Sequence, residues 1–171
     1  MCDIRNPAGK IALPPAEEVR EGLERALKRL TVEDEYLFRV NVNERTLTHK
    51  LEEYLQCHFE GWNVDCEYNR NGVERKKLRN LSDCHPEIDD EDGCTVFPDI
   101  IVHKRGRSED GEPTRNLLVI EAKKSSNKTD AKKDHDKLRL YKQELRYQHS
   151  AFVVFAVKTS RAAWKLEFDP E

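Results

Sequence analysis

Apolar residues recur at helical spacing in three stretches of the chain. Over residues 15–30 and 44–59 they repeat at steps of three and four, with Asn43 as the N-cap of the second stretch. The same spacing returns over residues 130–149. We therefore predict three helices, the first of which follows an irregular arm over residues 1–14.

Shorter apolar runs predict strands between and after these helices. The expected strands cover residues 62–69, 95–104, 116–124, 151–158 and 162–168. The second and third strands form a β-hairpin, and the fourth is apolar throughout, which is typical of a strand covered on both faces. The last is expected at the sheet edge, and the charged stretch 72–94 is expected to be a solvated loop.

The resulting order is helix, strand, strand, strand, helix, strand, preceded by an extra N-terminal helix. This order predicts an α/β fold with a mixed central sheet flanked by helices. A length of 171 residues suits one globular domain. We expect residues 43–171 to form its core and residues 1–42 to supply an arm and a helix packed on that core.

Composition narrows the class of protein. Hydrophobic residues and charged residues each make up 37% of the chain, and no apolar run approaches the roughly 18 residues of a membrane span. The first 15 residues also lack the apolar stretch of a secretory signal, so we expect a soluble, cytoplasmic protein. The formal charge of -3 excludes overall basicity, so any polyanion must meet a local patch.

The five cysteines include no CxxC pair and are an odd number, which favours reduced thiols. The alternative is a zinc site made of Cys84, His85 and Cys94 with Cys57 or His58. Their spacing matches none of the usual paired zinc knuckles.

Charged residues lie on both strands of the predicted hairpin. Asp99 comes directly after Pro98, and the third strand leads into Glu121, Ala122 and Lys123. Alternation puts Glu121 and Lys123 on the same side, and pairing of the strands brings Asp99 beside Glu121. Two adjacent carboxylates favour proton uptake or a bound divalent cation such as Mg²⁺ or Mn²⁺, and the lysine can offset phosphate charge or orient water. This chemistry suits phosphodiester hydrolysis.

Glu44 lies on the apolar stripe of the second predicted helix, on the same face as Leu47, Leu51 and Leu55. Its carboxylate is therefore expected at the N-terminal end of the buried side. The alternative is an exposed first-turn glutamate near the helix dipole.

Pro98-Asp99 and Glu121-Ala122-Lys123, in this order of elements, resemble the signature of the PD-(D/E)XK nuclease superfamily, which has the restriction-endonuclease-like fold. The resemblance spans about residues 43–158. It implies that Asp99, Glu121 and the Ala122 carbonyl bind the metal and that Lys123 is the catalytic lysine. It also implies that Glu44 is the additional acidic residue of the family.

Residues 137–145 resemble the QLxxYxxxL motif of the exonuclease-like branch of this superfamily, with Lys137 in place of Gln. Lys137 and Tyr141 share a helix face and could contact substrate phosphate together with Lys124, or they are a surface lysine beside a core tyrosine. A basic rim or a solvated lysine-rich loop is expected from Arg105, Arg107, Lys123, Lys124, Lys128, Lys132 and Lys133.

We therefore expect a Mg²⁺-dependent nuclease, with Mn²⁺ as a possible substitute, that hydrolyses DNA by metal-activated water. The alternatives are a catalytically inactive member of the same fold that binds nucleic acid or protein, and a zinc-stabilised structural protein. The expected partner is nucleic acid, first of all DNA, with no membrane, and a homodimer is compatible with the sequence.

Overall fold

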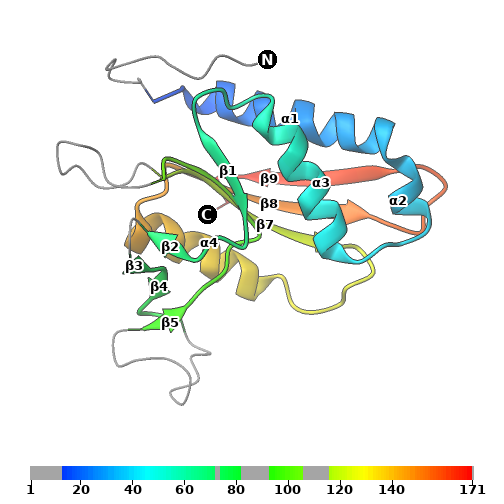
Figure 1. Ribbon diagram of the computed structural model, residues 1–171. Coiled ribbons are helices and arrows are strands. Elements are labelled where there is room, and N and C mark those ends of the chain that lie inside the picture. The colour runs from blue at the N-terminus through cyan, green and yellow to red at the C-terminus, as the bar shows by residue number, and fades with distance from the viewer. Residues whose placement is uncertain (1–12, 72–73, 82–92, 106–115, 171) are drawn as a thin grey trace.

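A computed structural model describes residues 13–71, 74–81, 93–105 and 116–170. It is an α/β fold in which a five-stranded mixed sheet packs against helices (Figure 1). The helices are α1 (Ala16–Glu33), α2 (Glu35–Arg39), α3 (Glu44–Gln56) and α4 (Lys132–Leu145). The strands are β1 (Asn63–Cys66), β2 (Arg70–Asn71), β3 (Glu74–Arg75), β4 (Lys77–Leu78), β5 (Cys94–Thr95), β6 (Ile100–His103), β7 (Asn116–Lys124), β8 (His149–Ala156) and β9 (Ala163–Phe168).

The main sheet has the order β1-β6-β7-β8-β9. All neighbours in it are antiparallel except β7 and β8, which are parallel. A parallel pair needs a crossover connection, and α4 supplies it. The central strand β7 is nine residues long, and all but the last of them are buried.

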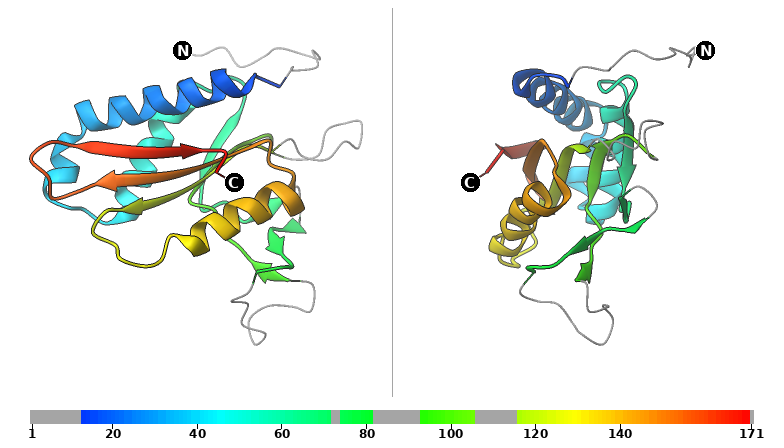
Figure 2. Two further views of the ribbon diagram at one scale, coloured as in Figure 1. Left: turned by 180° about the vertical axis from the view of Figure 1, so that it is seen from behind. Right: turned by 90° about the vertical axis from the view of Figure 1, so that its left-hand side faces the viewer.

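Helices cover both faces of this sheet. Figure 2 shows α1 and α3 on one side and α4 on the other. Side chains of α1 and α3 form one apolar cluster with alternate residues of the strands, including Leu118 and Ile120 of β7. The second cluster joins Val119 of β7 to Leu138 and Tyr141 of α4. This alternation decides which face each charged residue of β7 reaches.

The three predicted helices are present with shifted ends. The N-cap prediction is confirmed, because the Asn43 side chain accepts a hydrogen bond from the Thr46 amide at 2.7 Å. α4 ends at Leu145, four residues before the predicted end, because Arg146 takes the left-handed conformation with φ 58°. The five-residue helix α2 was not predicted, since it is too short to show a helical repeat.

The predicted strands are present with shifted ends, except that residues 95–104 are not one strand: Thr95 belongs to β5, and the main-sheet strand β6 covers only Ile100–His103. β6 and β7 form the antiparallel hairpin, with β6 beginning at Ile100 just after Pro98, as the missing N–H of proline requires. β9 pairs only with β8 and is one of the two edge strands of the main sheet, as predicted.

The described parts of residues 72–94 contradict the expectation of a solvated loop. β3, β4 and β5 belong to two small two-stranded sheets below the main sheet in Figure 1. Lys76 is fully buried, and its Nζ donates to the Tyr68 carbonyl at 3.1 Å and lies over the rings of Tyr68 and Tyr147. The charge of this stretch predicts exposure to solvent, but the aliphatic stem and ammonium of Lys76 lie against the aromatic rings of Tyr68 and Tyr147.

The cysteines follow the sequence expectation only in part. Cys57 and Cys66 are free, whereas Cys94 is disulfide-bonded, so the expectation of reduced thiols is wrong for Cys94. A disulfide sulfur is not available as a zinc ligand, which removes Cys94 from the zinc alternative. Cys84 and His85 of that alternative, together with Arg107 and residues 1–12, lie outside the described residues. Within the described ranges, none of the helices combines the length and the apolar character that a bilayer span requires.

Candidate active site

The structure brings Asp99 and Glu121 together at the carboxyl end of β7. Ile100 of β6 pairs with Ile120 of β7, so extending the antiparallel register by one residue sets Asp99 beside Glu121. The amide of Ala122 donates to Asp99 Oδ2 at 2.7 Å, which holds the aspartate against the strand. The two carboxylates therefore meet where β6 begins and β7 runs on past it.

Both carboxyl groups titrate abnormally because they are buried close to one another. Burial raises the pKa of Glu121 to about 8, and the negative charge of Asp99 adds to the rise. Burial likewise raises the pKa of Asp99 to about 6; the hydrogen bond from Ala122 opposes this rise, and the charge of Glu44 contributes to it. When no cation is bound, the negative charge of this carboxylate pair is therefore poorly compensated near neutral pH.

Three further charged side chains complete the group: Lys123 of β7, and Asp134 and Lys137 of α4. Lys137 Nζ lies 3.2 Å from Glu121 Oε2 and 3.8 Å from Asp134 Oδ1. Lys123 Nζ lies 3.6 Å from Asp134 Oδ2 and donates to the Thr129 carbonyl. Burial lowers the pKa of Lys137, but the charge and hydrogen bond of Glu121 outweigh it and raise that pKa above its ordinary value.

Glu44 reaches the same end of β7 from the other side of the sheet. Its Oε2 accepts a hydrogen bond from the Lys124 amide at 2.8 Å, so the first residue of α3 holds the last residue of β7. The Lys124 side chain extends away from this bond and donates to Asn41 Oδ1 at 3.2 Å and to the Val42 carbonyl at 2.7 Å. Glu44 is half-buried, which agrees with the expected position at the end of the apolar stripe.

The donor set fits a hard divalent cation. Carboxylate oxygens are among the ligands that Mg²⁺ and Mn²⁺ prefer, and Asp99 and Glu121 supply them. Glu121 Oε1 is buried and has no hydrogen-bond partner among the described residues. Burial costs this carboxylate its hydration, and a cation would offset that loss beyond what Lys137 and the Tyr141 hydroxyl provide at Glu121.

Tyr141 does not belong to a binding surface. Its side chain is fully buried in the cluster between α4 and the sheet, in agreement with the alternative prediction of a core tyrosine. Burial raises its pKa well above the ordinary value, and the charge of Glu121 adds to the rise. A nucleic acid has no access to Tyr141 in this conformation, so we do not retain it as a binding residue.

The expected basic rim divides into residues that are engaged and residues that face solvent. Arg105 forms an ion pair with Asp65, and Lys124 is held by the loop before α3. Lys128 is exposed on the segment that leads from β7 into α4, and Lys132 is the exposed first residue of α4.

Sequence reasoning missed Asp134, which lies within 4 Å of both lysine ammonium groups. Its signal was present in the sequence: Asp134 and Lys137 are three residues apart at the start of a helix that directly follows the Glu-Ala-Lys strand. The Thr129 carbonyl was not predictable, because it depends on the path of the loop between β7 and α4.

One cleft in the described part of the chain is a separate feature. It has a volume of about 860 Å³ and lies between the small strands and the C-terminal end of α4, lined by Arg75, Arg79 and Glu144 among others. None of the candidate active-site residues lines it. The candidate site is therefore distinct from this cleft.

Neither a protein-family model, nor a curated protein, nor a solved structure matches this chain. The geometry of the site is consequently the basis for a functional proposal.

Proposed function

We propose that this chain is a divalent-metal-dependent nuclease with a restriction-endonuclease-like fold that hydrolyses phosphodiester bonds in DNA. The observation that carries the proposal is the meeting of Asp99 and Glu121, both with raised pKa values, beside a buried Glu121 Oε1 without a partner among the described residues. The order α3, β1, β6, β7, α4, β8 also agrees with the core expected from the resemblance.

Asp99, Glu121 and the Ala122 carbonyl would hold the cation, and Glu44 would add negative charge from the α3 side. A bound Mg²⁺ supplies positive charge to a phosphoryl oxygen and lowers the pKa of a water molecule. Without it, two buried carboxylates would repel a phosphodiester. The protein's contribution is therefore to keep these acidic groups together despite their mutual repulsion.

The two lysines have different positions and so different proposed roles. The Lys123 side chain is only 8% exposed and lies deep in the group, where it can stabilise charge that develops at the reacting phosphate. The Lys137 side chain is 32% exposed, so it can contact a phosphate of an incoming strand. Asp134 lies between them and orients both, which makes it a positioning residue.

A catalytically inactive member of the same fold is the second candidate. The hydrogen bond from Lys123 to the Thr129 carbonyl favours it, because an ammonium held by a loop carbonyl is not free to act on phosphate. In an active enzyme, Lys123 exchanges this bond for a substrate oxygen.

The test is incubation of the purified protein with single- and double-stranded DNA and RNA in Mg²⁺, Mn²⁺ or EDTA. We expect cleavage of DNA that requires the cation, with binding measured in parallel by fluorescence anisotropy. Binding without cleavage in either cation would support the inactive module, and neither binding nor cleavage would overturn the proposal. An exposed-site variant, Glu60→Gln, controls for contaminating nucleases when it is purified beside Glu121→Gln.

A further inference from the structure

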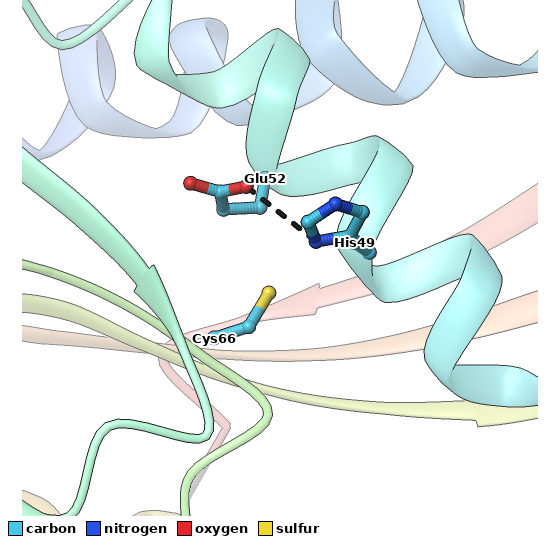
Figure 3. A group of neighbouring side chains, drawn as sticks. All are labelled: His49, Glu52 and Cys66. Atoms are coloured by element: carbon cyan, nitrogen blue, oxygen red, sulfur yellow. Dashed lines mark ion pairs between the residues drawn. The ribbon is translucent and has the colours of Figure 1, made fainter.

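Three side chains with the chemistry of zinc ligands meet between α3 and β1, outside the candidate active site. Figure 3 shows His49 and Glu52 projecting from α3 towards Cys66 at the end of β1. One ligand atom from each lies within 4.8 Å of the other two. His49 and Glu52 are three residues apart and thus share a helix face.

The separation between the His49 and Glu52 ligand atoms is close to that of a metal centre. Zinc bonds of about 2.0–2.3 Å at tetrahedral angles set ligand atoms roughly 3.3–3.8 Å apart. His49 Nδ1 is 3.9 Å from Glu52 Oε2, so this pair already has nearly the required separation. The His49 side chain is 68% exposed, so a small rotation of its ring can close the remaining gap.

The present contacts of the three side chains are weak and easily exchanged. The Cys66 thiol is free, and its contact with the Thr48 carbonyl is 3.8 Å long. Glu52 is 22% exposed, and its carboxylate has no ion-pair contact shorter than 3.9 Å among the described residues. A cation therefore displaces no strong interaction when it binds.

The surroundings of Cys66 are also negative. Burial raises the pKa of its thiol to about 12, and the charges of Glu52, Asp99, Glu67 and Asp65 add to the rise. The same negative potential that disfavours a bare thiolate attracts a divalent cation, whose charge stabilises the thiolate.

We propose that His49, Glu52 and Cys66 bind Zn²⁺ or a similar transition-metal dication, with a water or an external ligand in the fourth position. Imidazole and thiolate are ligands that select zinc over magnesium. Since Glu44 begins α3 and the Glu67 amide donates to the Asp99 carbonyl at 3.3 Å, the ion would join the two segments that carry acidic residues of the candidate active site. The site does not depend on the proposed nuclease activity.

The test is a Co²⁺ titration of the metal-free full-length protein in oxygen-free buffer, followed by absorbance. We expect one equivalent of Co²⁺ to produce a thiolate-to-cobalt charge-transfer band in the near ultraviolet, which Zn²⁺ then abolishes. Oxygen ligands alone give no such band, so Co²⁺ bound at Asp99 and Glu121 does not interfere. The readout is independent of cleavage, so failure of this site is distinguishable from failure of the proposed function.

Cys57 offers a matched control, because it is the other free cysteine of the described residues and is exposed. Cys66→Ser is expected to lose the band, while Cys57→Ser retains it. His49→Ala and Glu52→Gln should each weaken Co²⁺ binding at least about tenfold, because even the loss of a residue that only hydrogen-bonds a metal ligand lowers metal affinity by about that factor. A band absent from the wild type, retained in Cys66→Ser or lost in Cys57→Ser would overturn the proposal. Circular dichroism of each variant confirms that the fold is retained.

Discussion

One face of β7 is apolar from Leu118 to Ala122, whereas the opposite face is charged at Glu121 and Lys123. Leu118, Ile120 and Ala122 pack into the cluster under α1 and α3. On the opposite face, Glu121 and Lys123 are only 3% and 6% exposed, yet both are ionisable. The same strand thus holds a conventional core on one side and buried charges on the other.

The difference follows from the helices that cover each face. α3 presents an apolar stripe to the sheet, whereas the first turns of α4 bring Asp134 and Lys137 to it, with Leu138 and Tyr141 following. Replacing buried ion pairs by apolar residues is often neutral or stabilising by roughly 1–4 kcal/mol. Stability alone therefore does not account for charges in this position, and the effects of substitutions on the charged face test whether it carries the proposed function.

The largest effect is expected from the two central carboxylates. Asp99→Asn and Glu121→Gln each remove a proposed cation ligand, so cation-dependent cleavage should fall by at least about a hundredfold to a thousandfold. Thermal stability should hold or rise, because like-charge repulsion is relieved. Cleavage assays and melting curves measure the two effects. Wild-type cleavage by either variant would show that the charged face is not the active site.

Lys123→Ala should lower turnover about a hundredfold, the usual size of the loss when one group that stabilises transition-state charge is removed. Mg²⁺ binding should remain, since a lysine does not coordinate the ion. Calorimetry and single-turnover kinetics separate these quantities. Lys128→Ala, an exposed lysine on the following loop, is the matched control. Equal turnover in both variants would exclude Lys123 from catalysis.

Lys137→Ala should act on substrate binding more than on turnover. Loss of one phosphate contact should raise KM about tenfold and reduce the salt dependence of DNA binding by roughly 0.7–0.9 in the log–log slope. Mg²⁺ should bind more tightly, because Lys137 no longer competes for Glu121 Oε2. Lys132→Ala, an exposed residue of the same helix, should leave all three quantities unchanged. An unaltered salt slope in Lys137→Ala would argue against a phosphate contact.

The charged face also predicts how stability depends on pH without metal. The folded-state pKa of Glu121 is raised from 4.5 to about 8, so the folded protein binds more protons than the unfolded chain between these values. The contribution of Glu121 to the free energy of unfolding is complete below about pH 4.5 and is lost as the pH rises towards about 8. The loss is at most about 1.4 kcal/mol per unit of pKa shift. Melting curves in EDTA from pH 5 to 8.5 should show this decline in the wild type.

Glu121→Gln is the control for the pH effect, because it keeps the shape of the side chain and cannot ionise. The difference in melting temperature between the two proteins should grow with pH, and Mg²⁺ should stabilise the wild type more at pH 8 than at pH 6. Parallel pH dependence in both proteins would mean that Glu121 is not the group concerned.

Much of this arrangement could be predicted from the sequence. One apolar run begins directly after Asp99 and another ends at Glu121, and a hairpin allows few registers between them, so the meeting of the two carboxylates could be predicted from alternation. The place of Glu44 followed from its position on a helical stripe. In each case a periodic pattern several residues long predicts the face of the strand or helix on which one charged side chain lies.

Other features could not be predicted, because they depend on contacts between segments distant in the sequence. β2 to β5 are two residues long each and show no periodicity, and the burial of Lys76 depends on the rings of Tyr68 and Tyr147. The disulfide of Cys94 was not expected from cysteine count and spacing. Asp134 gained importance only once α4 was packed against β7.

The smallest effect is expected from Glu44, which reaches the site from the apolar face of β7. In Glu44→Gln the amide oxygen can still accept the hydrogen bond from the Lys124 amide, so stability should change by only a few tenths of a kcal/mol. Removal of the charge should lower the pKa of Asp99, to whose rise Glu44 contributes, and should raise the Mg²⁺ concentration for half-maximal cleavage about tenfold. Glu44→Ala also removes the acceptor and should cost about 1–3 kcal/mol of stability in addition. Cleavage measured against Mg²⁺ concentration for both variants separates charge from hydrogen bonding. If the Glu44→Gln curve superimposes on the wild type while Glu44→Ala is only less stable, Glu44 is a structural tie between α3 and β7, and the functional charges belong to the other face alone.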